Sequence, residues 1–199
     1  MGKRVLEMNE LVSRRIAETI EVKKKILQDE TLLQNVSLTA ERMIYSLKHE
    51  GKLVLCGNGG SASDAMHFAG ELVGRFQKER SSWPALVLNS DPVAMSSIAN
   101  DYDYSEVFSR QVDAFAHKKD ILIGISTSGN SENVLKAIKA AKSKGAYTVG
   151  LLGHGGGRIA EEAGMSIVVP SDVTARIQES HIVIIHILCE LIEEAMSEK

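Results

Sequence analysis

Four side chains that can bind a metal or transfer a proton lie at helical spacing in two distant parts of the chain. His67 and Glu71 are four residues apart, so both side chains project from one face of the expected helix. Gln178 and His186 lie eight residues apart in the last long apolar segment, roughly 12 Å along a helix. One metal or substrate touches both only if the side chains lean toward each other. Otherwise the site combines different chains.

Each of these residues also has an ordinary structural explanation. His186 is surrounded by Ile and Leu, and a lone histidine in such a setting is commonly a hydrogen-bonded core residue. Glu71 fits equally well on the solvated face of a helix. The four residues by themselves therefore leave the choice between a reactive site and ordinary helix packing open.

Two loops rich in glycine and hydroxyl groups follow apolar runs. They are Gly57-Asn58-Gly59-Gly60-Ser61 and Ser126-Thr127-Ser128-Gly129-Asn130-Ser131. Glycine lets the backbone approach a ligand, and free N–H groups at a helix N-terminus favour an anion, although both loops also suit plain turns and N-caps. Neither loop is a Walker A loop, because no lysine follows the glycines. Nor is the first a dinucleotide fingerprint, because Ala62 stands where the third glycine is needed. Loops that offer hydroxyl groups but no lysine suit a compact sugar phosphate better than a triphosphate.

The apolar pattern predicts the elements that position these groups. Up to Gly51, three- and four-residue steps predict two helices, with a break from Asp29 and Glu30 and with Gly51 as the C-terminal glycine. Five apolar runs then predict strands at Leu53–Cys56, Ala85–Leu88, Ile121–Ile125, Thr148–Leu152 and Ile167–Val169. Helical segments are expected near 62–77, 92–117 (broken around Asn100–Tyr104), 131–144, 157–163 and 174–196. This alternation is typical of a parallel, doubly wound α/β sheet.

Composition limits the classes of function. A chain of 199 residues suits one domain over 1–199, with a helical arm over 1–50 and an α/β core over 51–199. The net charge of −3 predicts neither a nucleic-acid nor a membrane surface. No apolar run reaches the ~18 residues that span a bilayer, and the charged N-terminus is not a signal peptide, so we expect a cytoplasmic protein. Cys56 and Cys189 lie in apolar stretches and are expected to be buried rather than bridged.

The predicted first helix bears on assembly. It carries a continuous apolar stripe of Val5, Met8, Val12, Ile16 and Ile20. Such a stripe has to be buried, either on the helix's own sheet or on another subunit. We favour the second arrangement.

Longer motifs of the chain resemble the phosphoheptose isomerases, a family of the sugar isomerase (SIS) domain group. The resemblance covers nearly the whole chain in order, through Cys56–Ser61, Asp64–Ala69, Glu71–Phe76, Ala99–Asp101, Gly124–Ser131 and Arg176–Glu179 with His186. It implies a three-layer sandwich with a five-stranded parallel sheet in flavodoxin-like order. It also implies a homotetramer with sites near subunit interfaces, and one zinc ion (Zn2+) per subunit. The implied activity converts sedoheptulose 7-phosphate to D-glycero-D-manno-heptose 7-phosphate, the first step toward activated heptose for surface polysaccharide such as lipopolysaccharide.

The resemblance also assigns roles by position. The zinc ligands would be His67, Glu71, Gln178 and His186. The substrate contacts would be Asn58, Gly59, Gly60, Ser61, Glu71, Asn100, Asp101, Ser126, Thr127, Ser128, Ser131 and Gln178. Isomerisation through an enediol(ate) needs a base and an acid, for which we expect Glu71 and His186, while zinc would polarise the carbonyl and hydroxyl or hold the enediolate. Coordination would lower the basicity of Glu71, so its two roles compete.

Two other functions fit the same fold. Close relatives bind the replication initiator protein DnaA without isomerase activity and have other residues where Glu71 and His186 stand. The presence of both residues favours the enzyme. A sugar-phosphate-sensing regulator or a hexose phosphate isomerase is the second alternative, but a regulator usually carries a DNA-binding domain, and 199 residues leave no room for one.

Overall fold

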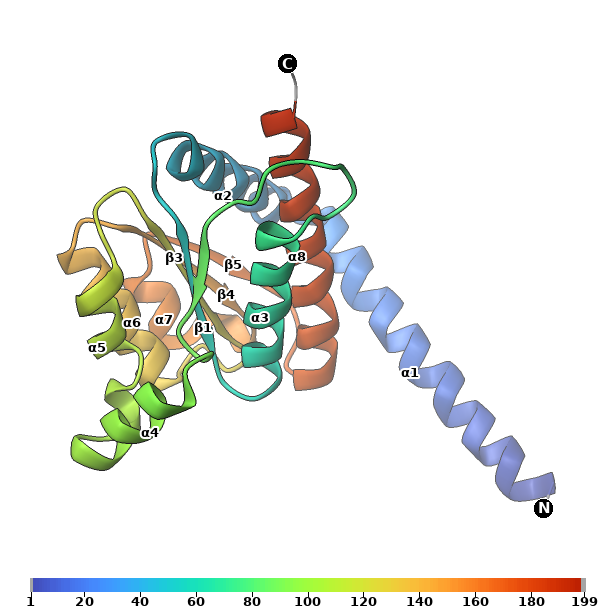
Figure 1. The fold of residues 1–199 in the computed structure, drawn as a ribbon. Coiled ribbons are helices and arrows are strands. Elements are labelled where there is room, and N and C mark those ends of the chain that lie inside the picture. Colours follow the sequence, from blue (N-terminus) through green and yellow to red (C-terminus); the bar gives the residue numbers. More distant parts are fainter. Residues whose placement is uncertain (1, 198–199) are drawn as a thin grey trace.

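The structure is a computed structural model that describes residues 2–197 as a parallel sheet with helices on both faces and one projecting helix (Figure 1). The strands are β1 (Leu53–Gly57), β2 (Ala85–Val87), β3 (Ile121–Ser126), β4 (Tyr147–Leu152) and β5 (Met165–Val168). The helices are α1 (Gly2–Gln28), α2 (Glu30–Lys48), α3 (Gly60–Val73), α4 (Pro92–Asp101), α5 (Ser109–Phe115), α6 (Glu132–Ser143), α7 (Gly157–Glu162) and α8 (Thr174–Ser197). Two short 3₁₀ turns are η1 (Tyr104–Glu106) and η2 (His154–Gly156).

The sheet confirms the predicted α/β class. Its five strands are parallel in the order β2-β1-β3-β4-β5, which is the flavodoxin-like order. Successive side chains of a strand point to opposite faces, so Leu53 and Leu55 pack under α2, α3 and α8, whereas Val54 and Cys56 pack under the helices of the other face. Burial of all five β1 residues explains why the strand reads as an unbroken apolar run.

Both cysteines are buried, as predicted. Burial raises the pKa of the Cys56 thiol to about 12, and burial followed by the nearby charge of Glu71 does the same for Cys189. Both thiols therefore stay protonated near neutral pH and pack as small apolar side chains.

The predicted helix ends need three corrections. The break between α1 and α2 is Asp29 alone, whose carboxylate accepts the N–H of Leu32 as an N-cap, so Glu30 is already helical. After α2, the left-handed position is taken by Glu50, with φ of 64°, and not by Gly51. Gly51 is required for another reason, because a Cβ there would lie 2.2 Å from the carbonyl oxygen of Lys119.

The third correction concerns α3, which spans 60–73 rather than 62–77. The helix ends at Val73 because the backbone leaves the helical conformation at Gly74, with φ of −78° and ψ of −116°, and Arg80 of the following segment donates to the carbonyl of Glu71. The edge strand β5 begins at Met165, two residues before the predicted Ile167.

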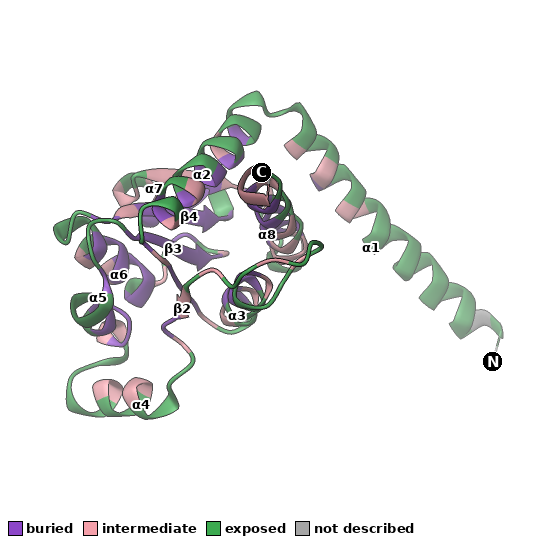
Figure 2. Ribbon diagram, turned by 45° about the horizontal axis from the view of Figure 1, so that its top comes forward, coloured by how far each residue is buried: buried purple, intermediate pink, exposed green. Residues whose placement is uncertain are grey.

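The helix α1 extends away from the body of the molecule, and most of its length is exposed (Figure 2). All five residues of the predicted apolar stripe are about half exposed, with Val12 at 56% and Ile16 at 57%. By contrast, α2 packs its apolar face into the core beside the sheet and α8. Within residues 2–197, no helix is long and apolar enough to cross a membrane.

Candidate active site

The strand order reverses at β1, which is flanked by β2 on one side and β3 on the other. Ligands of open parallel sheets bind at such a point, outside the carboxyl ends of the strands. Gly57 is paired in register with Ile125, so β1 and β3 end level with each other. The two hydroxyl-rich loops therefore leave the sheet side by side.

The first loop is shaped by glycines that allow close approach. Gly59 is the N-cap of α3, and its φ of 55° is a conformation that other residues rarely adopt. A Cβ on Gly60 would lie 2.0 Å from Nε2 of Gln178, so this glycine admits the amide of α8 to the loop. Ser61 is buried, while Asn58 is half-buried and exchanges two 2.9 Å hydrogen bonds with the amide of Asn133.

The second loop gathers its hydroxyls at the N-terminus of α6. Oγ of Ser126 lies 2.9 Å from Oγ of Ser131 and 3.4 Å from Oγ of Ser128. Ser131 is the N-cap of α6, but its side chain makes no capping hydrogen bond. N–H groups at the start of α6 are therefore left for a ligand, beside the three hydroxyls. Thr127 is half-buried beside them. Such a set of neutral donors at a helix N-terminus suits an anion such as phosphate.

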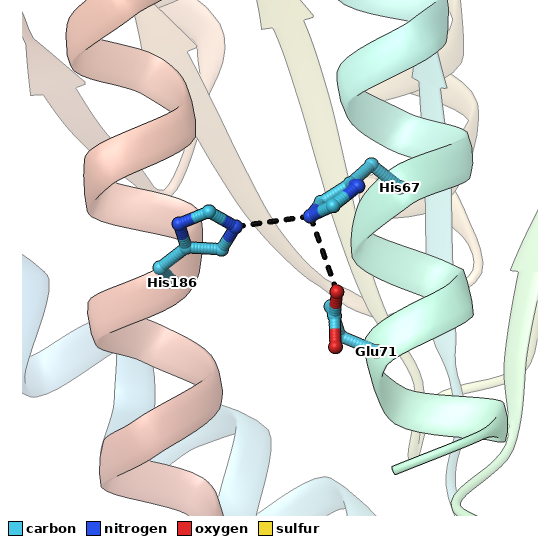
Figure 3. A group of neighbouring side chains, drawn as sticks. All are labelled: His67, Glu71 and His186. Atoms are coloured by element: carbon cyan, nitrogen blue, oxygen red, sulfur yellow. Dashed lines mark hydrogen bonds and ion pairs between the residues drawn. The ribbon is translucent and has the colours of Figure 1, made fainter. Parts of the chain in front are cut away.

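The helices α3 and α8 pack together and bring three predicted residues into one cluster (Figure 3). Nε2 of His67 lies 2.9 Å from Nε2 of His186 and 3.2 Å from Oε1 of Glu71. The side chains of His67 and Glu71 are 44% and 23% exposed, so the cluster is open to solvent on this chain. His186 is therefore not a sealed core residue, unlike His181, which is buried and faces the carbonyl of Leu152.

The donor set of this cluster fits a zinc ion. One ligand atom from each of the three residues lies within 4.8 Å of the others. Two imidazole nitrogens and one carboxylate oxygen are the kind of set that catalytic zinc sites use, with a fourth position left for another ligand. Tetrahedral ligands at about 2.0 Å from zinc are about 3.3 Å apart, close to the separations found here.

Gln178 and the pair Asn100–Asp101 lie away from this cluster along the chain. The amide of Gln178 contacts Gly60 at the start of α3, and Gln178 lies eight positions before His186 on α8. Asn100 and Asp101 end α4, are exposed, and share a 2.9 Å hydrogen bond. The next segment returns to the first loop, where the hydroxyl of Tyr104 donates to Oδ1 of Asn58 at 3.3 Å.

Several residues near the site were missing from the sequence-based set. Asp64 lies three residues before His67 on α3, and its Oδ2 is buried with no hydrogen-bond partner among the described residues. Burial raises the pKa of Asp64 to about 6, against the opposing influence of His67. The helical spacing of Asp64 and His67 could have revealed this residue. Asn133 and Tyr104 gave no such signal, because they reach Asn58 through tertiary packing.

Known proteins resemble this chain over nearly its full length. The model of the SIS domain family matches residues 13–153. The phosphoheptose isomerase of Helicobacter pylori is 49% identical over 96% of this chain and 99% of the relative. Phosphoheptose isomerase 1 of Campylobacter jejuni is 50% identical over 86% of this chain and 93% of the relative.

Solved structures give the same result. The phosphoheptose isomerase of Neisseria gonorrhoeae superposes with a TM-score of 0.89 at 40% identity, covering 94% of this chain and 99% of that one. The Francisella tularensis enzyme also gives a TM-score of 0.89, at 33% identity over 94% and 98% of the two chains. The chain therefore belongs to the SIS domain family and, within it, to the phosphoheptose isomerases.

Proposed function

We propose that this protein interconverts sedoheptulose 7-phosphate and D-glycero-D-manno-heptose 7-phosphate, toward activated heptose for surface polysaccharide. The observation that carries the proposal is the meeting of Glu71 with His67 and His186 between α3 and α8. The activity named for relatives that are 49% and 50% identical supports the substrate. Because sugar phosphates are cytoplasmic metabolites, we place the reaction in the cytoplasm.

The two loops provide the phosphate site of this proposal. Ser126, Ser128 and Ser131 would donate to the phosphate together with the N–H groups that begin α6. Gly60 and His67 are seven residues apart on α3, or about 10 Å. A substrate has to be elongated to reach both ends from one chain, or the two groups come from different subunits.

The cluster provides the proton transfers. Glu71 removes a proton from carbon 1 of the ketose while His186 protonates the carbonyl oxygen on carbon 2, which gives the enediol. Glu71 then returns its proton to carbon 2 while His186 takes the hydroxyl proton from the oxygen on carbon 1, which becomes the carbonyl of the aldose. Gln178 and Asn58 are expected to orient the sugar hydroxyls from the first loop. Asn100 and Asp101, at the exposed end of α4, are expected to contact the substrate.

The proposed function is tested directly by NMR. Incubation of the protein with sedoheptulose 7-phosphate is expected to produce the signals of the aldose until equilibrium is reached. An inert protein would contradict the proposal, and binding of DnaA in the same preparation would select the alternative without isomerase activity.

We also propose that His67, Glu71 and His186 hold one Zn2+ per subunit. Gln178 contacts Gly60 and lies about 12 Å along α8 from His186, so it would be the fourth and weakest ligand only by leaning toward the metal or from another subunit. Bound there, the metal would polarise the carbonyl and hydroxyl oxygens of the substrate. Zinc titration followed by calorimetry is expected to show one site per chain, which His67→Ala removes. The exposed His117 lies in the turn before β3, at the amino ends of the strands, so His117→Ala is a matched control that should leave the site intact.

Chelation supplies the second part of this test. Removal of zinc is expected to lower the isomerisation rate, and added zinc is expected to restore it. A purified sample without zinc whose rate does not respond to a chelator would remove the metal from the mechanism.

We further propose that α1 assembles the protein into a homotetramer. The helix has 27 residues, about 40 Å, and carries an exposed apolar stripe along it. Full burial of each large apolar side chain would contribute about 1.5–3 kcal/mol to association. Assembly would also cover the cluster of His67, which is open on the single chain.

The double change Val12→Asp and Ile16→Asp is expected to dissociate the tetramer, because two carboxylates would be buried in an apolar contact. Analytical ultracentrifugation at micromolar concentration measures the result. Arg14 lies about 200° around α1 from Val12 and Ile16, so Arg14→Asp places a carboxylate on the opposite face of the helix and should leave the assembly unchanged. A tetramer that survives the double change would exclude this surface as the contact.

A further inference from the structure

The segment after α3 is bound to α8 by one buried carboxylate. Glu193 is 2% exposed, and its Oε2 accepts the N–H groups of Gln77 at 2.9 Å and Lys78 at 2.8 Å. Its Oε1 accepts the N–H of Phe76 at 3.3 Å and Nε of Arg80 at 3.2 Å. Burial by itself would raise the pKa of Glu193, but these donors outweigh it and hold the pKa below its usual value. The carboxylate is therefore charged and fully occupied.

The cation of this pair caps the helix that carries the reactive glutamate. Nη2 of Arg80 donates to the carbonyl of Glu71 at 2.7 Å, and Nη1 donates to the carbonyls of Leu72 at 2.9 Å and Gly74 at 3.2 Å. The guanidinium also lies 3.7 Å from the ring centre of Trp83, which seals it from solvent. Carbonyls at the end of a helix lack partners within the helix, so Arg80 fixes the last turn of α3.

Both residues act on the same cluster of side chains. Phe76, held by Glu193 through its N–H, stacks on the ring of His186 with centroids 5.8 Å apart. Glu193 and His186 are seven residues apart on α8, two turns along nearly the same face. The pair therefore connects the last turn of α3 to α8, the two helices whose side chains make the 2.9 Å contact between His67 and His186.

We propose that Arg80 and Glu193 are positioning residues of the isomerase site, which hold Glu71 and Phe76 in place relative to His186. The inference rests on the proposed function. A misplacement of about 1 Å at a site can cost about a hundredfold in rate. Loss of the pair should therefore lower kcat far more than it changes KM, because neither residue contacts the loops that would hold the phosphate.

The chain contains a matched control for this pair in the turns that precede β1 and β3. Asp120 is 3% exposed and precedes β3. It accepts the N–H groups of Lys52 at 3.0 Å and His117 at 2.8 Å, and it pairs with Nζ of Lys52 at 2.6 Å. Asp120→Asn and Glu193→Gln thus each remove the charge of a buried carboxylate bound to backbone N–H groups and one cation. Only Glu193 borders the cluster.

The experiment compares kcat, KM and the thermal midpoint of the two variants, at a temperature where both are folded. Glu193→Gln is expected to lower kcat about tenfold or more with KM within about threefold, whereas Asp120→Asn should lose stability but keep kcat within about twofold. Arg80→Lys keeps a positive charge near Glu193 but loses the several N–H donors of the planar guanidinium. It serves as the milder variant if Glu193→Gln does not fold. It should lower kcat about fivefold.

A second measurement does not depend on turnover. The imidazole NMR signals of His67 and His186 are expected to shift in Glu193→Gln or Arg80→Lys and to stay in place in Asp120→Asn. Unchanged imidazole signals, or a kcat as high as in the parent, would overturn the positioning role. If the parent protein itself is inert toward the heptose phosphate, the proposed function fails, and the imidazole signals still decide whether the pair positions the cluster.

Discussion

Glu71→Gln is expected to lower kcat for the heptose phosphate about a thousandfold, within the range that a positioned general base contributes. The substitution keeps the size of the side chain but removes the carboxylate that lies 3.2 Å from His67 and that would take the proton from carbon 1. Because Glu71 is not part of the buried core, the thermal midpoint should change little. Steady-state kinetics and thermal unfolding measure the two effects.

Isotope exchange makes this test specific for proton abstraction. In deuterium oxide, the parent protein should introduce deuterium at carbon 1 of the ketose, and Glu71→Gln should not. Glu41 is an exposed glutamate on α2, so Glu41→Gln is a control that should behave as the parent. Full turnover by Glu71→Gln would remove the residue from the role of base.

His186→Ala is expected to lower kcat about a hundredfold to a thousandfold, because it removes the group assigned to protonate the substrate oxygen. It also removes one of the two imidazole nitrogens of the cluster, which lie 2.9 Å apart, and the ring on which Phe76 stacks. Zinc affinity should therefore fall together with kcat. Kinetics and zinc calorimetry on the same preparation test both expectations.

Added imidazole gives a direct readout of the missing group. The cavity left by His186→Ala is half-buried and bordered by His67, so free imidazole should enter it and restore part of the rate. His117→Ala, at an exposed site, should retain the parent rate and show no response to imidazole. A fully active His186→Ala protein would contradict the assignment of His186 as the general acid.

The class of fold was predictable because its signals are local. Buried parallel strands such as β1 and β3 are apolar on both faces, so each appears as an uninterrupted run bounded by polar turns. The two loops were recognisable because each follows such a run. Their adjacency followed from a general rule on strand ends, and the paired register of Gly57 and Ile125 confirms it.

Two of the wrong helix ends share one physical cause. Gly51 was assigned the left-handed position by its residue type, but the structure uses it for close packing on Lys119 and places Glu50 in that conformation. Likewise α3 ends at Val73, and Arg80, from beyond the turn, binds the carbonyls that the end of the helix leaves free. Neither contact can be read from a local pattern, because each depends on a segment that packs there in the folded protein.

By itself, the sequence determined the α/β class, both hydroxyl-rich loops, the buried cysteines and the shared helix face of His67 and Glu71. Only the tertiary structure decided that His186, 119 residues after His67, completes their cluster, while Gln178 contacts Gly60. It also decided that Arg80 and Glu193 join α3 to α8. The reason is that periodicity reports which face of an element is buried, whereas the contact between two helices is set by side chains that interlock across them.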